Sequence, residues 1–355
     1  MNEEKTKHIL MITARSDMGG GPKHILQLLQ NLSLRKNFRV SIASPRQKPF
    51  FNKYQKISHR HITIPIRSFS VISFIKLLFF CKTQNIEYIH SHGRGGGMYS
   101  RLLGLWGFKI IHTFHGAHND PSLKGQLKLF IDRFLTLLTD HFICVSESEK
   151  SKALSLKIVD QNKVDIINNG VNMSEILHTD KSDLRRIYKL PKNKKIWGSL
   201  TRLSHEKGND LFLEMLKRSQ YDEDYVFIIA GSGPEEENYK KFLIKNNIKN
   251  VIFSGEIENP ISFLKGLDGF FSFSRGEGLP LSVIEAIACE LPCVISDVSG
   301  HDQFENQVQL FSLGDTDHFL QLVRNTARPI HLNQFRKDYS EDRMLNETIR
   351  LYNSH

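Results

Sequence analysis

Short apolar runs alternate with amphipathic segments along almost the whole chain. Runs of strand length cover residues 8–14, 38–44, 62–66, 88–92, 109–114, 141–146 and 163–167. Between them, apolar residues spaced three and four apart predict helices at 23–34, 71–82 and 126–138. This alternation is typical of a parallel sheet whose strands are joined by crossover helices.

The second half repeats the scheme after a turn signal, Asn168-Asn169-Gly170. Strands are predicted at 195–201, 225–230, 251–254, 269–274 and 293–296, and helices at 209–218, 235–246, 281–289 and 341–352. A length of 355 residues suits two ordinary domains. We therefore predict an α/β protein with two Rossmann-like domains, residues 1–170 and 171–337. Their sheets would face each other across a cleft, with the ligand beyond the carboxyl ends of the strands.

The loop after the first predicted strand, residues 16–22, is rich in glycine and contains Gly20 and Gly21. Glycines let a backbone approach an anion closely, and the helix that follows offers free amides. The loop lacks the complete G-x-G-x-x-G fingerprint of a dinucleotide site. A plain tight turn is therefore the alternative interpretation of this loop.

Two cations follow the first strand of the second half. Arg202 ends that strand, and Lys207 comes just before the helix predicted at 209–218. Cations at a helix start are unfavourable unless an anion joins them. Together they could hold a diphosphate and stabilise a leaving group that gains charge. A pair of exposed cations is the alternative.

The strongest motif places two carboxylates eight residues apart. Glu277 follows a predicted strand, and Glu285 lies on the helix after a Gly-Leu-Pro turn that ends at Pro280. Proline suits a helix start, whose free amides can hold a phosphate. Glu285 stands among apolar residues and needs a partner, which a ribose diol would supply, and Glu277 could accept hydrogen bonds from sugar hydroxyls. The alternative is one capping and one surface glutamate.

Together these segments resemble the retaining family-four glycosyltransferases of the GT-B fold, the glycosyl transferases group 1. The likeness rests on Glu277-x7-Glu285, the Gly-Leu-Pro turn and the loop from Arg202 to Lys207. It extends over nearly the whole chain through the Gly-rich loop, Thr113-Phe114-His115-Gly116, Val145-Ser146-Glu147, Asn169-Gly170-Val171 and the final helix. The resemblance implies that the C-terminal helix, 338–355, completes an acceptor-side domain 1–170, and that 171–337 binds the nucleotide-sugar donor.

The resemblance also implies a role for each candidate residue. Arg202 and Lys207 would hold the donor diphosphate, Glu277 the transferred sugar and Glu285 the ribose. The remaining donor contacts would come from the turn Gly278, Leu279 and Pro280, from His115 beside the sugar, and from Gly20 and Gly21, which would let donor and acceptor approach. His115 is favoured among sixteen histidines because it follows a strand; His112 is expected inside that strand.

Two segments depart from the family pattern. Glu290 stands where the family usually has a helix-ending glycine, and residues 301–305 differ from the usual acidic pattern. No metal or other cofactor is expected. Asp222-Glu223-Asp224 precedes a strand and is interpreted as a solvated turn, and Asp315 begins a helix. Cations and helix amides can replace a metal on a diphosphate.

Charge is unevenly spread along the chain. Residues 1–170 carry 25 Lys and Arg against 11 Asp and Glu, a net +14, whereas residues 171–355 carry a net −4. The first half therefore suits an anionic partner such as acidic lipid, a phosphorylated substrate or nucleic acid, with a merely solvated basic surface as the alternative. The apolar segment 69–81 is too short to span a bilayer, which needs about 20 residues. With Arg67, Lys76 and Lys82 around it, this segment could lie on acidic lipid or form an ordinary crossover helix.

The polar N-terminus and four cysteines without metal or disulfide spacing suggest a cytoplasmic protein, with peripheral association to the inner face of the membrane as a further expectation. We expect a retaining glycosyltransferase of hexosyl or N-acetylhexosaminyl type that moves a sugar from a UDP-sugar to a hydroxyl acceptor. The expected acceptor is a lipid-linked or surface-polysaccharide intermediate of O-antigen, capsule or lipopolysaccharide, carried on a polyprenyl diphosphate. No nucleic-acid partner is expected. Two alternatives stay open: a sugar-nucleotide epimerase of the same fold and a non-enzymatic protein that binds an anionic ligand.

Overall fold

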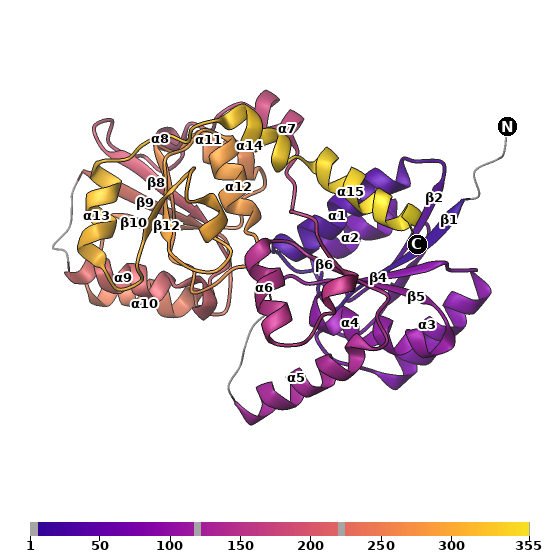
Figure 1. Cartoon of the computed structure of the whole chain (residues 1–355). Coiled ribbons are helices and arrows are strands. Elements are labelled where there is room, and N and C mark those ends of the chain that lie inside the picture. Colours follow the sequence, from indigo (N-terminus) through magenta and orange to yellow (C-terminus); the bar gives the residue numbers. More distant parts are fainter. Residues whose placement is uncertain (1–5, 117–121, 219–223, 355) are drawn as a thin grey trace. The chain divides into compact units, whose positions relative to one another are not determined.

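The computed structural model describes residues 6–116, 122–218 and 224–354 (Figure 1). The chain divides into two compact units. Unit 1 contains Met1–Asn169 and Met344–His355, and unit 2 contains Gly170–Arg343. Of the acidic segment 222–224, Asp222 and Glu223 lie outside the described residues.

Unit 1 is built on a seven-stranded parallel sheet in the order β3-β2-β1-β4-β5-β6-β7. Its strands are β1 (Lys7–Thr13), β2 (Phe38–Ser44), β3 (His61–Thr63), β4 (Tyr88–His92), β5 (Lys109–Thr113), β6 (His141–Cys144) and β7 (Val164–Ile166). Its helices are α1 (Gly20–Ser33), α2 (Phe50–Ile57), α3 (Val71–Thr83), α4 (Gly93–Leu103), α5 (Leu123–Thr136), α6 (Glu147–Ser155) and most of α15 (Glu341–Ser354), with 3-10 turns η1 (Gly104–Trp106) and η2 (Gln161–Lys163).

Unit 2 repeats the design with a six-stranded parallel sheet, β10-β9-β8-β11-β12-β13. Its strands are β8 (Lys195–Leu200), β9 (Tyr225–Ala230), β10 (Val251–Gly255), β11 (Gly269–Ser272), β12 (Cys293–Ser296) and β13 (Gln309–Phe311). Its helices are α7 (Met173–His178), α8 (Leu184–Ile187), α9 (Asn209–Arg218), α10 (Glu236–Lys245), α11 (Pro260–Lys265), α12 (Leu281–Ala288), α13 (Thr316–Arg324) and α14 (Leu332–Asp338), with 3-10 turns η3 (His205–Lys207) and η4 (Asp302–Phe304).

Both sheets have the strand order of a doubly wound fold, in which the chain reverses direction across the sheet at one point. That point lies between β1 and β4 in unit 1 and between β8 and β11 in unit 2. Ligands of open parallel sheets bind beyond the carboxyl ends of the strands at this position. The predicted α/β class with two Rossmann-like sheets is confirmed.

The C-terminal helix belongs to the core of unit 1. Met344, Leu345, Leu351 and Tyr352 are buried together with side chains of α1, α2, β1 and β2 (Figure 1). We predict that the C-terminal helix, 338–355, completes the first domain. Of this segment, residues 338–343 belong to unit 2. The reason is local backbone pairing: Val171 N donates to Tyr339 O (2.9 Å) and Glu341 N donates to Val171 O (3.0 Å).

Helix α4 packs its backbone directly on the sheet. A Cβ on Gly96 would lie 2.4 Å from Ile12 O, and one on Gly95 would lie 2.5 Å from the Cβ of Ala14. Glycines normally disfavour helices, by about 1 kcal/mol each, so the sequence pattern gives no sign of this helix. Here they are required by the close approach to β1.

Helix α12 is followed by Glu290, a residue type that is unusual at a helix end. Glu290 adopts the left-handed conformation, with φ of 65°, at the position where a glycine is usual. Leu291 N donates to Ala286 O (3.1 Å), and the Glu290 carboxylate accepts from Arg336 Nη2 (2.9 Å). The ion pair and the closed helix end hold Glu290 in this conformation despite its Cβ.

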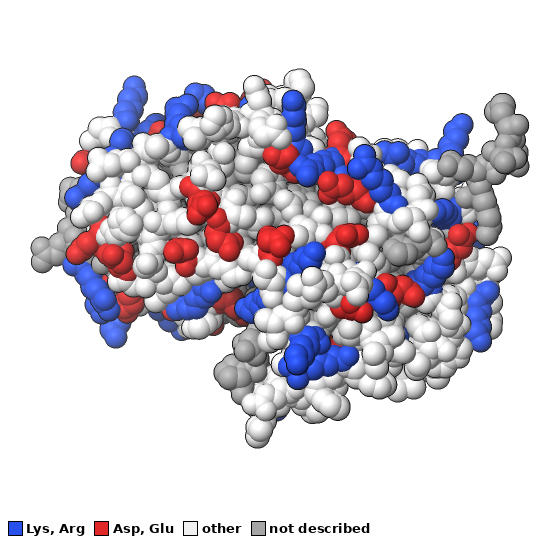
Figure 2. Space-filling view, in the orientation of Figure 1, with Lys and Arg blue, Asp and Glu red and all other residues white. Residues whose placement is uncertain are grey.

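Two helices of unit 1 expose apolar side chains. On α5 and its C-cap residue the exposed side chains recur at intervals of four and three: Leu123, Leu127, Phe130, Phe134 and Leu137. On α3 the exposed residues are Val71, Ile72, Ile75 and Phe79, with Trp106 of η1 packed against Phe74 at 5.5 Å between ring centroids. Figure 2 shows the surface over α5 as mostly white with a blue group of cationic side chains. Among the described residues, no helix is both long enough and apolar enough to cross a bilayer.

Candidate active site

The loop that carries Arg202 and Lys207 is held close to the end of β11 by a glycine. Gly208 has φ of 65°, and a Cβ there would lie 1.9 Å from Phe273 O. No other residue can occupy this position without moving the backbone. Lys207 is thereby brought beside the loop that follows β11.

Lys207 and Glu277 meet in an ion pair. Lys207 Nζ donates to Glu277 Oε1 at 2.5 Å, and Ser274 Oγ donates to the same oxygen at 2.6 Å. Burial opposes ionisation of this carboxyl, but the Lys207 ammonium, His301 and the two hydrogen bonds outweigh it and lower the pKa of Glu277. Glu277 is therefore an anion at neutral pH, held against a cation and largely shielded from water.

A second ion pair ties the same two loops together. The Arg275 guanidinium binds both carboxylate oxygens of Asp210 at 2.8 and 2.6 Å, and it also donates to the carbonyl of His205. Arg275 N donates to Glu206 O at 2.9 Å. Bidentate guanidinium–carboxylate pairs fix orientation as well as distance, so Arg275 holds the segment after β11 against the start of α9.

The loop after β12 also supports the backbone of Glu277, through Ser299 and Gly300. Glu277 N donates to Ser299 O at 2.9 Å. Gly300 has φ of 86°, and a Cβ on it would lie 2.5 Å from Glu277 O and 2.8 Å from Gly278 O. The turn from Gly278 to Pro280 therefore rests against the loop after β12.

Helix α12 begins directly after this turn. Pro280 is its N-cap residue, directly before the predicted helix start at 281, and among the described residues no side-chain cap hydrogen bond is formed there. The first amides of α12 therefore have no side-chain acceptor, which is the condition for binding an anion at a helix start. Leu279 is buried, and Glu285 lies one turn into the helix, 4% exposed among apolar neighbours.

Arg202 follows β8 by two residues and is half-buried. Its charge acts on Glu206, whose pKa is lowered by the hydrogen bond from Ser204 first and by Arg202 to a smaller degree. The structure thus brings Lys207 and Glu277 into direct contact and places Arg202 in the same loop as Lys207.

The candidate residues of unit 1 lie at the carboxyl end of its sheet, around His115. This residue follows β5 and stacks on His92, the last residue of β4, with 5.6 Å between ring centroids. Gly21 lies beside the His115 ring, and a Cβ on it would be 3.6 Å from the ring, an ordinary van der Waals contact. Gly20 and Gly21 form the first turn of α1, whereas the sequence predicts a helix from residue 23.

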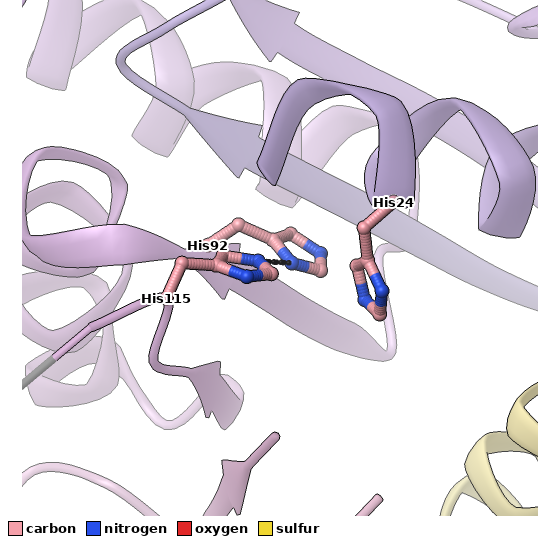
Figure 3. Close-up of side chains that lie close together, drawn as sticks. All are labelled: His24, His92 and His115. Carbon is pink, nitrogen blue, oxygen red and sulfur yellow. Dashed lines mark hydrogen bonds between the residues drawn. The ribbon is translucent and has the colours of Figure 1, made fainter. Parts of the chain in front are cut away.

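His115 is neutral at physiological pH. Burial lowers its pKa to about 4, with a smaller contribution from the Arg15 charge. Its Nε2 lies 3.3 Å from Nδ1 of His92, and the His24 ring on α1 stands 5.0 Å away (Figure 3). A neutral imidazole can donate or accept one hydrogen bond at a sugar hydroxyl, but it offers no charge to a phosphate.

Several residues of these two sites were not identified from the sequence. Ser274 and His301 both act on Glu277, and His24 and His92 both contact His115. His92 carries the same signal as His115, a histidine at the end of a predicted strand. His24 lies on a helix, and His301 follows a glycine turn, so no pattern marks either one.

Comparison with known proteins decides the family. Residues 18–175 match the family model described as Glycosyltransferase Family 4, and residues 180–313 match that of Glycosyl transferases group 1. The chain belongs to the GT-B glycosyltransferases. The predicted class of enzyme, a glycosyltransferase that acts on a nucleotide sugar, is confirmed at this level, which favours a transferase over the epimerase and the non-enzymatic binding protein.

Individual relatives are distant from this glycosyltransferase. UDP-Gal:alpha-D-GlcNAc-diphosphoundecaprenol alpha-1,3-galactosyltransferase of Escherichia coli is 29% identical over 274 residues, which cover 72% of this chain and 70% of the relative. The O-antigen biosynthesis glycosyltransferase WbnH of Escherichia coli is 28% identical over 236 residues, or 65% of this chain and 64% of the relative, slightly less than two thirds of its length. The crystal structure of HepE from Anabaena with UDP and glucose superposes with a TM-score of 0.83 at 14% identity, covering 98% of this chain and 100% of that one, and thus shares the fold.

Proposed function

We propose that this glycosyltransferase transfers a hexose or N-acetylhexosamine from a UDP-sugar to a hydroxyl of a diphospholipid-linked glycan, with retention of the anomeric configuration. The observation that carries the proposal is the Lys207–Glu277 pair at the switch point of the unit 2 sheet. An ammonium, a held carboxylate and the uncapped start of α12 offer the three kinds of partner that a nucleoside diphosphate sugar needs.

Each group has a defined task in this proposal. Lys207 and Arg202 bind the donor diphosphate, together with the amides of Gly278 and Leu279 in the turn before α12. Glu277 accepts hydrogen bonds from the transferred sugar, and Glu285 binds the ribose diol. In unit 1, neutral His115 contacts a sugar hydroxyl, while Gly20 and Gly21 leave room for donor and acceptor.

The proposed reaction is a front-face substitution. The bond between the anomeric carbon and the β-phosphate oxygen breaks as the acceptor oxygen bonds to the same face of that carbon. The acceptor proton passes to the departing phosphate oxygen, and the nucleoside diphosphate leaves. Positive charge from Lys207 and Arg202 stabilises the leaving group as its charge grows, which requires no metal ion on the diphosphate.

The acceptor assignment draws on the relatives. One Escherichia coli relative is named for a GlcNAc-diphosphoundecaprenol acceptor and a UDP-galactose donor, and another for O-antigen biosynthesis. HepE, which shares the fold, has been crystallised with UDP and glucose. The net charge of +14 on residues 1–170 suits an acceptor that carries a diphosphate.

Unit 1 also has a surface that suits an acidic membrane. Helix α5 and its C-cap residue Leu137 expose five large apolar side chains in one stripe, and the cations Lys124, Lys128 and Arg133 of the helix accompany them. Its only acidic residue, Asp132, is buried and paired with Arg94 and Arg101. An apolar stripe flanked by cations is the pattern of a helix that lies in a lipid interface. We therefore place the enzyme on the cytoplasmic face of the membrane, where its acceptor lipid would be found.

The function is tested with purified protein, a synthetic GlcNAc-diphosphate on a long alkyl chain, and UDP-glucose, UDP-galactose, UDP-GlcNAc and UDP-GalNAc in turn. Release of UDP together with a product one sugar heavier supports the proposal. Proton NMR of the product then gives the anomeric configuration, and a β-linkage from an α-linked donor would exclude retention. Donor binding without transfer would leave the donor assignment standing and overturn the acceptor.

A further inference from the structure

Three histidines from different parts of unit 1 converge at the carboxyl end of its sheet. His24 comes from α1, His92 ends β4 and His115 follows β5 (Figure 3). One ring nitrogen of each lies within 4.8 Å of those of the other two. His24 and His92 are each only 3% exposed, whereas His115 is partly open to solvent.

Their hydrogen bonding leaves ring nitrogens unused. His24 Nδ1 and His92 Nε2 are buried and have no hydrogen-bond partner among the described residues. A buried polar atom without a partner is unfavourable by about 1–3 kcal/mol. The contact between His92 Nδ1 and His115 Nε2 is 3.3 Å, long for a hydrogen bond. Of these two nitrogens, His24 Nδ1 is the one that a shared ligand could satisfy, because the His92 nitrogen that faces His115 is Nδ1.

The same distances suit a metal ion. In a tetrahedral zinc site the metal–nitrogen bonds are about 2.0–2.1 Å, which places the ligand nitrogens about 3.3 Å apart. His92 and His115 already have this spacing. The ring nitrogen of His24 lies no more than 4.8 Å from the other two, so it would have to approach them by at most about 1.5 Å. Three imidazoles without a carboxylate favour Zn²⁺, Cu²⁺ or Ni²⁺ over Mg²⁺ or Ca²⁺.

Second contacts support the orientation of the rings. The His24 ring forms a side-chain hydrogen bond with Asn169, the last residue of the first segment of unit 1. Metal-binding histidines normally use their second nitrogen in this way. Neutral imidazole is also the form that binds a metal, and burial keeps all three rings neutral at pH 7.

We propose that His24, His92 and His115 bind one divalent transition-metal ion, Zn²⁺ foremost, with the fourth position open to water or an anionic oxygen. The open position lies on the side of His115, the partly exposed ring. The imidazole that donates the present His92–His115 hydrogen bond would change tautomer, so that both rings present a lone pair to the metal. Because His115 is a ligand, occupancy would also fix the ring that the proposed function assigns to the sugar.

The test uses untagged full-length protein, treated with EDTA and desalted, and needs neither donor nor acceptor. Its outcome is therefore independent of the proposed function. Zn²⁺ is titrated in competition with a chromogenic chelator, and Co²⁺ is added separately to obtain the visible spectrum of a tetrahedral site. We expect one equivalent of Zn²⁺ per chain and intense Co²⁺ absorption.

Variants connect the binding to these residues. His24→Gln and His92→Gln should each weaken Zn²⁺ binding by more than about 100-fold, since even the loss of an outer-shell partner weakens it 10–100-fold. His112→Gln is the matched control: His112 is equally buried in the neighbouring part of β5 and bonds Ser91, and it should bind Zn²⁺ as the wild type does. Circular dichroism checks that each variant is folded.

Three results would overturn the proposal: no stoichiometric Zn²⁺ in the wild type, equal binding by both variants, or equal loss in His112→Gln. If a variant does not fold, X-ray absorption of the zinc-loaded wild type decides the question. Three histidine nitrogens at about 2.0–2.1 Å would support the site, and fewer would reject it.

Discussion

At the scale of single residues, the candidate site is organised around one carboxylate. Glu277 Oε1 accepts from both Lys207 and Ser274, while its backbone amide is held by Ser299. The ion pair is partly shielded, with side-chain exposures of 28% for Lys207 and 12% for Glu277. Removing one partner would therefore leave a charge in a poorly solvated place.

Lys207→Ala should lower kcat/KM by about 10²–10³-fold, because it removes a cation from a leaving group that gains charge. It should also lower the free energy of unfolding by about 1–3 kcal/mol, since the Glu277 carboxylate loses its partner. Steady-state transfer kinetics and urea unfolding measure the two effects. Lys240→Ala is the matched control, because Lys240 pairs with Glu236 on the exposed face of α10 and should affect neither. Wild-type transfer by Lys207→Ala would contradict the assigned role.

Glu290 makes a second prediction at this scale, on stability. Its left-handed backbone is unfavourable by about 1–2 kcal/mol for a residue with a Cβ, and glycine avoids this strain with a partly offsetting loss of about 0.5–1 kcal/mol in entropy. Glu290→Gly should therefore be more stable than Glu290→Ala by about 0.5–1 kcal/mol, although both lose the ion pair with Arg336. Differential scanning calorimetry compares the two variants. Equal or reversed stabilities would show that the helix end relaxes to another conformation.

At the scale of elements, regular strands and long amphipathic helices could be predicted from the sequence, and closely packed elements could not. Residues 38–44, 88–92, 225–230 and 293–296 match β2, β4, β9 and β12. The signal is clearest in β9, because a buried parallel strand is often a continuous apolar run. Helix α4 was missed because its three adjacent glycines serve backbone packing rather than helix propensity. Strand β13 was missed because three residues, Gln309–Phe311, are too few to form a pattern.

In the candidate site, too, some residues could be predicted from the sequence and others could not. Glu277, Lys207 and His115 could be selected because each stands just after a predicted strand or at a predicted helix start, where ligands of this fold class bind. Of their other partners, His24 and Ser274 could not be predicted. The contact of His24 with His115 depends on how α1 crosses the sheet, and that of Ser274 with Glu277 depends on a turn conformation set by Gly300.

Helix α5 gives a prediction for the membrane surface. Vesicles with anionic lipid should bind the protein in sedimentation assays, and Phe130→Ser/Phe134→Ser should reduce binding at least tenfold because the stripe loses two of its five apolar anchors. Phe242→Ser on α10, which lies in unit 2, is a control that should bind vesicles as the wild type does. Binding should weaken with added salt, since the cations of α5 attract the lipid charge. Equal binding to neutral vesicles would reject the electrostatic part, and equal binding by the double variant would reject α5.

At the scale of the whole molecule, the buried histidines distinguish the two units. In unit 1, His24, His90, His92 and His112 are buried near one end of the sheet beside the partly exposed His115. Burial lowers the pKa of all five, to about 3 for His90 and about 4 for His115. In unit 2, His301 is the only fully buried histidine among the described residues. The C-terminal helix shares this network, since Tyr352 Oη lies 2.6 Å from His90 Nδ1.

The sign of the pH effect follows from proton uptake. An unfolded histidine takes up a proton near pH 6.5, whereas the buried rings stay neutral until about pH 4 or below. Between these values the unfolded state binds more protons, so unit 1 is fully stable above pH 6.5 and loses stability as the pH falls. Each such histidine can remove up to about 1.4 kcal/mol per pH unit. In unit 2 the lowered pKa values of Glu277, Asp210 and Glu206 act only at more acidic pH.

We therefore predict that unit 1 unfolds before unit 2 when the protein is acidified from pH 7 to 4.5. The chain has two tryptophans, so Trp106→Phe leaves Trp197, buried in β8, as a fluorescent reporter of unit 2 alone. Circular dichroism in the same variant reports both units and should show a first loss of helix while Trp197 emission is unchanged. His24→Gln should move that first transition to lower pH, because one proton-binding site of the unfolded chain is gone, whereas His178→Gln on the surface should not. Coincident transitions at every pH would contradict this prediction and would mean that the two units unfold as one. A shift of that single transition to lower pH in His24→Gln would then show that a buried histidine of unit 1 limits the acid stability of both units.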